Sequence, residues 1–533
     1  MKRSPLTVTV LTDTHLYSLK NGFEGKAYDR ANSKSQILLA ESGEVLDAAF
    51  AQISADKRSD IVLICGDLTS NGDLESHKEM IAKLRRLKES GKRVYVITAT
   101  HDFRKNGVTS AYRGDEKIEV LTATRDMLFD MYREFGPDEA ISVHRESMSY
   151  VVQLSDGYRL FALNDDTNKN GKSGFSDECF EWITAEAERA RRDGQMIIAM
   201  THHPLIAPSP IYAMIGKGDM LGDYEARIEQ LADIGVSFIF TGHTHIHNIS
   251  DHCSKRGNRL YDICTGSPMG YPGVMRTVTF ADDVDITTDY VSEPQSFRDK
   301  GIKLHDALGQ QLIGIIRSMI EVAATDVDRL ADMAVSISIK PKLVYKFGWI
   351  IKPIFKFLNS LKVSTVARWT KKETGLKKED YADIKDVKVV DIITELVLNL
   401  YGGESKYPPE TPVYKITVGL LHIIDSILGI LHIDMKKITK VAGSATELIE
   451  PLLYNTNIDS YTAKLPIPRY YPQGEQGDIV EKPATSETVK KSKKGLPLII
   501  AAALILIVFL PVWLLLILIG FLSNSVKYRD KLK

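Results

Sequence analysis

The stretch Leu6-Thr-Val-Thr-Val-Leu-Thr-Asp-Thr-His15 joins a β-strand pattern to a carboxylate and an imidazole. From Leu6 to Leu11, apolar residues alternate with threonine. This alternation predicts a first β-strand and not a signal peptide, because the apolar run is short and no small-residue cleavage site follows it. Asp13 and His15 come directly after the strand, and short Asp and His clusters also follow later strand candidates.

Strand candidates alternate with amphipathic helix patterns through residues 1–295. Such alternation predicts an α/β domain with a largely central sheet. The turn Ser155-Asp156-Gly157 lies between two strand patterns, Tyr150–Leu154 and Tyr158–Leu163, and predicts a hairpin. The other strand candidates are Thr7–Leu11, Ile61–Cys65, Val94–Ala99, Ile197–Met200 and Val236–Phe240, and the clearest helix patterns are Leu74–Ser90 and Asp177–Asp193.

The polar clusters that follow the strands contain ligands for metal ions. In chain order they are Asp13-Thr14-His15, Gly66-Asp67, Thr100-His101-Asp102, His202-His203-Pro204 and Gly242-His243-Thr244-His245. Ligands gather at strand C-termini in open α/β sheets. Carboxylates and neutral imidazoles form the mixed set that binds Mn, Fe, Zn or Co. In an extended segment, Asp-x-His and His-x-His would direct both side chains to one side.

The order of these clusters resembles the signature of the calcineurin-like metallophosphoesterase family over about residues 5–290. The resemblance implies a two-sheet sandwich flanked by helices, and two divalent metal ions that share a ligand. On one metal it implies Asp13, His15, Asp67 and His245, with Asp67 bridging, and on the other His202 and His243. His101 matches the family position that contacts the phosphoryl group as a catalytic acid or transition-state stabiliser.

Thr100 departs from the family pattern, in which an Asn precedes the His-Asp pair and ligates the second metal. A threonine hydroxyl is a weaker ligand, and two functions remain open. The first is a dinuclear metal-dependent phosphoester hydrolase that attacks a phosphomonoester or phosphodiester with metal-activated water. The second is a membrane-tethered, non-enzymatic scaffold or binding protein with a degenerate metal site. We favour the enzyme, because no other ligand is replaced; the sequence does not name its substrate.

Composition limits the other classes of function. The chain has 533 residues, which is enough for two or three domains. Its formal net charge of -1 does not indicate a nucleic-acid partner. The 4 cysteines show no C-x-x-C spacing, which favours reduced thiols over disulfides.

A second, helical pattern follows over residues 296–465. Its apolar runs are Leu312–Val322, Val389–Leu400 and Ile416–Ile433. The last of these carries His422, Asp425 and His432, so a buried or interfacial helix is favoured over a membrane span. Residues 466–494 are rich in Pro, Gly, Glu, Lys, Ser and Thr and predict a flexible linker.

The C-terminus predicts a membrane anchor. Leu496–Leu522 carries no charge over 27 residues, which is long enough to span a bilayer. We therefore expect a single-pass anchor within residues 495–523, a short basic tail over 524–533, and a cytosolic catalytic domain. A re-entrant hairpin is the alternative.

The segment Lys340–Lys378 predicts a second membrane contact. It carries eleven Lys or Arg and one acid, Glu373. A helical projection of Lys342–Lys362 separates the lysines from an apolar arc, and Trp349 falls among the lysines. The arc comprises Phe347, Ile350, Ile351, Ile354, Phe355, Leu358 and Leu361, and the opposite lysines are Lys342, Lys346, Lys352 and Lys356. This pattern predicts either an interfacial helix on an anionic membrane or a helix packed on its own domain with a solvated basic face.

Overall fold

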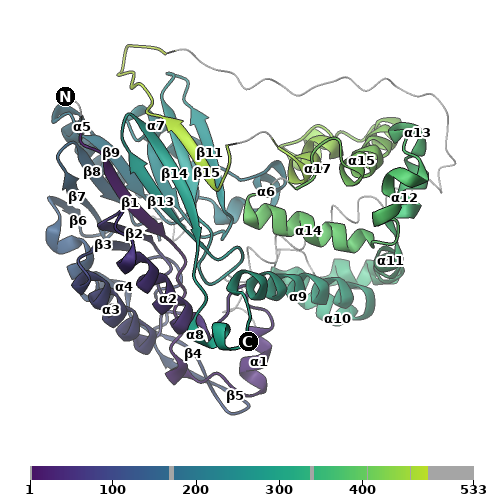
Figure 1. Ribbon diagram of the computed structural model, residues 1–533, viewed down its shortest axis with the longest axis horizontal. Coiled ribbons are helices and arrows are strands. Elements are labelled where there is room, and N and C mark those ends of the chain that lie inside the picture. Colours follow the sequence, from purple (N-terminus) through teal and green to yellow (C-terminus); the bar gives the residue numbers. More distant parts are fainter. Residues whose placement is uncertain (1–2, 167–172, 337–340, 405, 456–457, 478–533) are drawn as a thin grey trace.

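The computed structural model describes residues 3–166, 173–336, 341–404, 406–455 and 458–477. Figure 1 shows two parts side by side: a pair of β-sheets with their helices, and a group of helices built from the later residues.

The first sheet is built on parallel strands joined by helices. β1 is parallel to β2, with Val8 opposite Ile61, and β2 is parallel to β3, with Ile61 opposite Arg93. β2 is apolar and buried along its whole length, because helices cover one face of the sheet and the second sheet covers the other. Within the described residues its strands lie in the order β15 (Thr462–Pro466), β14 (Asp283–Tyr290), β13 (Val274–Phe280), β1 (Leu6–Leu11), β2 (Ile61–Cys65) and β3 (Arg93–Ile97), and its connecting helices are α2 (Ser42–Ala55) and α3 (Leu74–Glu89).

The second sheet has a parallel centre and antiparallel edges. Ile183 of α5 and Ile228 of α7 pack on Ile197 and Ile239 at its outer face. The strands, in spatial order within the described residues, are β11 (Asn248–Cys253), β12 (Arg259–Cys264), β10 (Phe238–Thr241), β9 (Met196–Met200), β8 (Tyr158–Ala162), β7 (Ser149–Ser155) and β6 (Ser142–His144); α5 spans Asp177–Arg192 and α7 spans Tyr224–Asp233. The smaller elements of this part are α1 (Lys26–Asn32), α4 (Arg125–Met131), α6 (Pro210–Ile215) and the hairpin of β4 (Val108–Arg113) and β5 (Glu116–Leu121).

The two sheets pack face to face over an apolar core. Val10 and Leu63 of the first sheet and Ile198 and Phe240 of the second are fully buried in this core. The predicted two-sheet sandwich is therefore confirmed, together with the predicted strands, the hairpin and the two amphipathic helices. All four cysteines are free thiols, as the sequence predicted.

The helical region follows the sandwich. Its helices among the described residues are α8 (Gln295–Asp299), α9 (Leu304–Thr325), α10 (Val327–Ser336), α11 (Pro341–Ser360), α12 (Val363–Trp369), α13 (Lys371–Thr374), α14 (Val389–Gly402), α15 (Pro412–Ile430), α16 (Met435–Thr439) and α17 (Ala445–Leu453). Within the described part of the chain, α15 alone is long and apolar enough to cross a membrane, judged by length and composition. It packs against α12 and α17, and its Asp425 carboxylate accepts hydrogen bonds from the backbone N–H groups of Ala445 and Thr446. The charge that argued against a membrane span therefore has partners at the start of α17.

The end of the described chain differs from the predicted linker. β15 pairs antiparallel with β14 at the edge of the first sheet, with Leu465 opposite Val284 (Figure 1). The residues after it also lie on the sandwich: the Tyr471 N–H donates to Asn258 Oδ1 at 2.7 Å, and the Gly477 N–H donates to the Arg256 carbonyl at 2.9 Å. The predicted linker thus begins within a sheet strand, because β14 offers an unpaired edge that five residues can complete.

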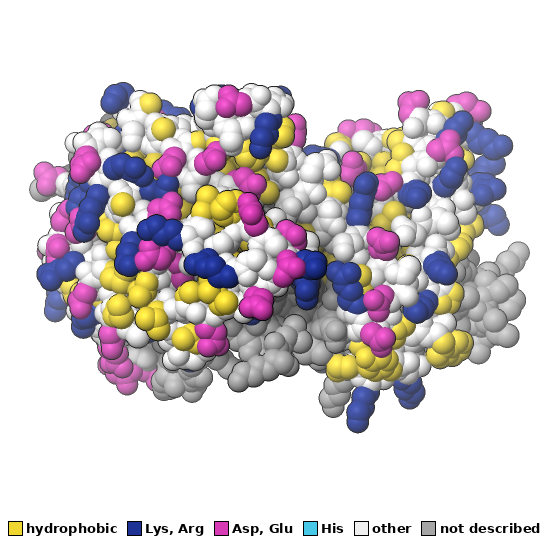
Figure 2. All heavy atoms as spheres, turned by 90° about the horizontal axis from the view of Figure 1, so that it is seen from below, with side chains coloured by type: hydrophobic (Ala, Val, Ile, Leu, Met, Phe, Trp, Pro, Cys, Tyr) yellow, Lys and Arg dark blue, Asp and Glu magenta, His cyan; other side chains and the backbone are white. Residues whose placement is uncertain are grey.

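α11 turns its lysines outward. Phe355 and Leu358 of the predicted apolar arc are buried inside the helical region, whereas Trp349 is 76% exposed and Tyr345 is 53% exposed. Part of the predicted apolar arc thus packs inside the helical region, and the membrane contact of this segment stays a prediction. In the space-filling view, Lys and Arg side chains gather along the outer edge of the helical region (Figure 2). The predicted anchor Leu496–Leu522 lies outside the described residues.

Candidate metal centre

Five strands deliver the predicted clusters to one edge of the sandwich. β1 ends at Leu11, before Asp13 and His15, and β2 ends at Cys65, before Asp67. β3, β9 and β10 end before Thr100, His202 and His243 in the same way. Because β1, β2 and β3 are parallel, and β9 and β10 are parallel, the ends of each set meet at one edge.

The backbone bends sharply at the candidate ligands. Asp13, His15, Asp67, His243 and His245 all have positive φ, between 40° and 64°. Non-glycine residues rarely adopt this conformation, and such outliers cluster at functional sites. The Asp-x-His and His-x-His pairs therefore reach the site through left-handed kinks, and not through the extended alternation that the sequence suggested.

Asp13, His15 and His245 form the first candidate ligand group. Their ligand atoms lie within 4.8 Å of one another. Nε2 of His15 lies 3.0 Å from Nε2 of His245, and Asp13 Oδ1 lies 3.6 Å and 3.5 Å from these two nitrogens. The other carboxylate oxygen of Asp13 accepts hydrogen bonds from Thr12 Oγ1 and from the His243 N–H, which leaves Oδ1 directed at the imidazoles.

Asp67, His202 and His243 form the second group. Asp67 Oδ2 lies 3.1 Å from His202 Nε2, which in turn lies 3.2 Å from His243 Nδ1. Nδ1 of His202 donates a hydrogen bond to the Cys65 carbonyl at 2.8 Å, because a carbonyl can only accept. Nε2 is then the nitrogen free to ligate, in the arrangement that orients metal-binding histidines.

Asp67 belongs to both halves of the site. It is grouped with His202 and His243, and also with His15 and His101. Its Oδ1 accepts the His101 N–H at 2.8 Å, which fixes the carboxylate between the two histidine sets. The resemblance implied a bridging role for this residue, and its position is compatible with that role.

The electrostatics of the site favour charged carboxylates. Burial opposes the ionisation of Asp13, but the imidazoles of His202, His15 and His245 outweigh it and hold the pKa of Asp13 well below its ordinary value. The pKa of Asp67 is likewise held low against its burial, mainly by His202 and His101.

The pKa values of His202 and His243 shift in opposite directions. Burial disfavours charge on His202, yet Asp67 and Asp13 raise its pKa to about 10. Burial and the neighbouring imidazoles of His203 and His202 keep the pKa of His243 well below its ordinary value. The carboxylates of Asp13 and Asp67 therefore favour positive charge within the cluster.

Buried polar atoms that lack hydrogen-bond partners indicate whether the site suits cations. Within the described residues, Asp13 Oδ1, His15 Nδ1, His245 Nδ1 and Thr100 Oγ1 are buried and make no hydrogen bond. A buried oxygen that lacks a partner is costly, and a cation would satisfy Asp13 Oδ1 and Thr100 Oγ1. The donor set of carboxylates, imidazoles and one hydroxyl fits divalent transition metals. Thr100 stays a candidate ligand on the strength of its unpaired hydroxyl.

His101 is held with one nitrogen facing the cluster. Its Nδ1 donates to the Ser70 carbonyl at 2.6 Å, and its Nε2 lies 3.9 Å from Asp67 Oδ2. Burial lowers the pKa of His101 to about 3, although Asp67 acts in the opposite direction. The imidazole is therefore neutral, and its Nε2 lone pair faces the site.

Two buried aspartates that are not ligands organise the loops. Asp102 accepts hydrogen bonds from the N–H groups of Leu68, Thr69 and Ala99, which joins the segments that follow β2 and β3. Asp73 caps α3 by accepting the Ser76 N–H.

Asp165 was not identified as a site residue from the sequence. It follows β8 and accepts hydrogen bonds from Thr201 Oγ1, the His203 N–H and His203 Nδ1, so it fixes the residues on both sides of His202. The His203 ring centroid lies 4.2 Å from that of His243. A run of three polar residues, Asn164-Asp165-Asp166, at a strand end was the available signal, but it is equally typical of a turn.

The histidines outside the signature have structural partners. His77 lies between Tyr132 and the Asp102 carbonyl, His144 contacts Ser147, His247 contacts Thr288, and His252 pairs with Glu229.

The helical region touches the loop that carries His245. The His247 N–H donates to the Tyr401 carbonyl at 2.9 Å, at the end of α14. Gly403, the C-cap of α14, lies so close that a Cβ there would be 1.8 Å from the His247 carbonyl oxygen. α14 therefore supports the segment two residues beyond a candidate ligand.

Comparisons with known proteins point to one family. Residues 6–247 match the model of the calcineurin-like phosphoesterase family. No curated protein matches the chain.

Several solved structures are similar to part of the chain. A dimetal phosphatase from Danio rerio is 14% identical with a TM-score of 0.38, over 53% of this chain and 95% of that one. A purple acid phosphatase from yellow lupin (Lupinus luteus) is 14% identical with a TM-score of 0.34, over 55% and 53%. An NAD nucleotidase from Haemophilus influenzae is 13% identical with a TM-score of 0.31, over 61% and 62%.

Proposed function

Since residues 6–247 form a domain of the calcineurin-like phosphoesterase family, we propose that this chain is a dinuclear metal-dependent phosphoester hydrolase. The observation that carries the proposal is that Asp67 belongs to two candidate ligand groups, one with His15 and His101 and one with His202 and His243. A single structural metal would need one such group and not two.

The residues divide naturally between two cations. Asp13, His15 and His245 would hold one, His202 and His243 would hold the other with Thr100 as an added oxygen ligand, and Asp67 would contact both. When bound, two divalent ions would neutralise the charge of a phosphoester and lower the pKa of water toward neutrality.

His101 would serve the phosphoryl group and not a metal. Its Nδ1 proton is committed to the Ser70 carbonyl, so Nε2 is the atom that can accept a proton or, once protonated, donate a hydrogen bond. Arg104 lies near enough to depress the pKa of His101, and its guanidinium donates to the Thr100 carbonyl. The two side chains together offer a phosphate a hydrogen-bonding group and a positive charge.

The proposal includes a membrane location with the catalytic domain in the cytosol. Its support is the uncharged segment Leu496–Leu522, which is long enough to span a bilayer. The four free cysteines agree with a reducing compartment. The substrate remains a phosphomonoester or phosphodiester of unspecified class.

Replacing the shared carboxylate tests the enzyme directly. Asp67→Ala should lose both metals and the hydrolysis of a generic phosphodiester while the protein stays folded. Asp156→Ala, which removes an exposed carboxylate from the β7–β8 turn, is the matched control and should change neither. Metal content by mass spectrometry and turnover with added Mn²⁺ are the two measurements.

Each alternative has a distinct result. Two metals retained in Asp67→Ala would overturn the ligand assignment. A wild-type protein that binds fewer than two metals and turns over no phosphoester would instead support the non-enzymatic protein with a degenerate metal site.

A further inference from the structure

One side of α11 packs on the helical region and the other side faces solvent. The helix lies against α9, α10 and α14. Val344 and Phe355 are buried, and a Cβ at Gly348 would lie 3.0 Å from a side-chain carbon of Val327 on α10. At about 100° per residue, six other side chains fall within about 120° of arc, on the side turned away from these contacts. They are Lys342, Tyr345, Lys346, Trp349, Lys352 and Lys356; all are exposed except the half-buried Lys352, and we call them the α11 basic face.

Two aromatic rings lie within the α11 basic face. Trp349 projects near the middle of the arc, with Lys356 on one side of it and Lys346 on the other. It is 76% exposed, which makes it the most exposed of the large hydrophobic side chains in the described part of the chain, and Tyr345 is 53% exposed. Trp and Tyr are enriched where proteins meet the interface of a bilayer, because the ring is apolar and carries one polar group. A tryptophan between lysines therefore suits a lipid surface better than it suits water.

No acid in the surrounding sequence offsets the positive charge of this face. α11 contains no Asp or Glu, and the longer stretch of residues 333–372 contains none either, whereas it carries nine Lys or Arg. An anionic bilayer attracts such basic segments over about one Debye length, and a neutral bilayer does not. Charge complementarity therefore selects an anionic lipid surface.

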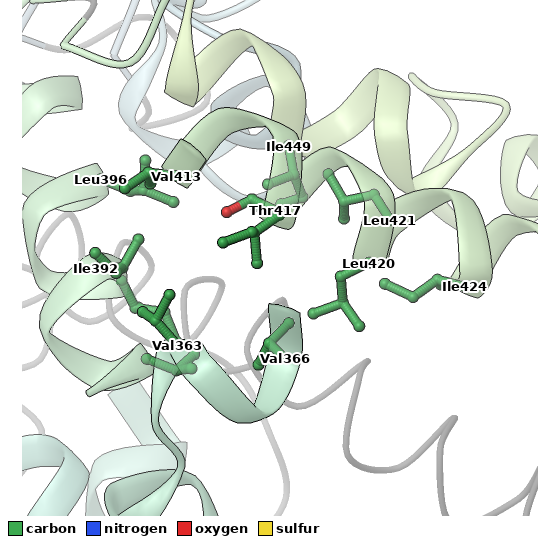
Figure 3. A pocket seen from close by; sticks show the side chains of 13 residues that line it. Val363, Val366, Ile392, Leu396, Val413, Thr417, Leu420, Leu421, Ile424 and Ile449 are labelled. Atoms are coloured by element: carbon green, nitrogen blue, oxygen red, sulfur yellow. The ribbon is translucent and has the colours of Figure 1, made fainter. Parts of the chain in front are cut away.

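The apolar side chains of the helical region face inward. Val366 of α12, Leu396 of α14 and Leu420 of α15 surround a small apolar cavity of about 90 Å³ (Figure 3). Phe355 and Leu358, which an interfacial helix would turn toward the lipid, are buried. Contact with a membrane would therefore use the lysines and the two exposed rings, on the opposite side of α11 from the apolar arc.

The rest of the chain would keep a bilayer within reach. The last described residue is Gly477, and the uncharged segment Leu496–Leu522 begins 19 residues later. A chain of that length spans at most about 65 Å, so an inserted anchor would hold the helical region close to the membrane surface. This step rests on the membrane location proposed above.

From these observations we infer that the α11 basic face docks on the surface of an anionic lipid bilayer. The lysine ammonium groups contact the lipid phosphates, and the Trp349 ring lies among the head groups. The contact is separate from the metal centre and does not depend on the proposed hydrolase activity.

Hydroxyl-radical footprinting of the full chain tests the docking. The wild-type protein is placed in nanodiscs of phosphatidylcholine, alone or mixed with phosphatidylglycerol, and peptide mass spectrometry measures the oxidation of Trp349. Because oxidation follows exposure, covering a ring that is 76% exposed should slow it several-fold in the anionic discs. High salt should reverse this protection, since it screens exposed charges. Met127 of α4, which lies in the sandwich away from α11 (Figure 1), is the internal reference and should be oxidised equally in all discs.

Two triple variants of equal charge show which lysines matter. The first combines Lys342→Gln, Lys352→Gln and Lys356→Gln and should abolish the protection of Trp349. The matched control removes three exposed lysines from the sandwich and should keep the protection; it combines Lys57→Gln, Lys117→Gln and Lys255→Gln. The thermal midpoint of each variant reports on folding, and the wild-type comparison of lipid and salt needs no variant.

Equal oxidation of Trp349 in neutral and anionic discs would overturn the inference. Protection that persists at high salt or without the three lysines would overturn it as well. Protection by polyglutamate but not by anionic lipid would reassign the face to an acidic protein partner. Carbonate extraction tests the membrane location separately: if carbonate removes the chain from membranes, the proposed anchor is refuted, and the same footprinting with added anionic vesicles then decides the docking.

Discussion

Gly403→Ala should disturb the metal centre from the far end of α14. Gly403 has φ 67°, and a Cβ added there would lie 1.8 Å from the His247 carbonyl oxygen and 2.9 Å from the Ser460 Cβ. Ordinary contact begins at 3.4 Å, so the backbone must move by about 3.4 − 1.8 = 1.6 Å. The helix end or residues 245–248 must give way.

Gly375→Ala is the matched control. Gly375 is the C-cap of α13 with φ 66°, and a Cβ there meets nothing within 4 Å. Both variants place alanine in a left-handed conformation, which costs about 1–2 kcal/mol. Only Gly403→Ala adds the overlap, and overpacking typically costs about 1–3 kcal/mol more.

The steric overlap created by Gly403→Ala should lower the affinity of the site for metal ions. If the displaced segment moves His245 with it, cation binding must return His245 to its original position. A coupling free energy of about 1–3 kcal/mol between this displacement and metal binding weakens the metal affinity by about 5–150-fold. The assay is equilibrium dialysis against Mn²⁺ with metal analysis, together with the thermal midpoint. We expect Gly403→Ala to lower both and Gly375→Ala to lower only the midpoint. Equal metal affinity in the two variants would show that α14 does not hold the His245 loop.

Four further substitutions probe individual contacts. Thr100→Asn should lower the divalent concentration that gives half-maximal activity, because an amide carbonyl ligates more strongly than a hydroxyl; an unchanged metal dependence would show that Thr100 is not a ligand. His101→Ala should reduce kcat by about 10²–10⁴-fold with a poor leaving group while metal content stays constant, and an unchanged kcat would reject its role. Asp165→Asn should weaken metal binding about tenfold in dialysis, because it loosens the residues around His202; wild-type affinity would mean that the aspartate serves folding alone. Arg276→Met should release β15, because the buried guanidinium donates to the carbonyls of Ser460 and Cys264, and we expect faster proteolysis near residues 454–461 than in Arg276→Lys.

The strands and the candidate ligands could be predicted from the sequence because their signals are local. Six residues from Leu6 to Leu11 are enough to recognise a strand, and Asp13 and His15 indicate a polar site directly after it. The same holds at Ile61–Cys65 and Asp67. Once the strands are parallel neighbours, their ends must meet, so five local patterns determine one shared site.

Residues that act through distant contacts were not predictable in this way. Asp165 looks like any turn residue until the second sheet brings it to Thr201 and His203. The left-handed backbone at the ligands has only a weak local sequence signal, because Asp and His adopt it more often than most other residues but still uncommonly. The surrounding structure imposes that conformation.

Two larger features were decided only by tertiary structure. β15 is five residues of ordinary composition, and its pairing with β14 depends on an edge formed some 180 residues earlier in the chain. In α11 the sequence determined that one face is apolar and the other basic, but not what covers the apolar face. A helical periodicity specifies which side chains lie together, whereas the partner for that face comes from the packing of the whole helical region, which buries Phe355 and Leu358 and leaves Trp349 with the lysines outside.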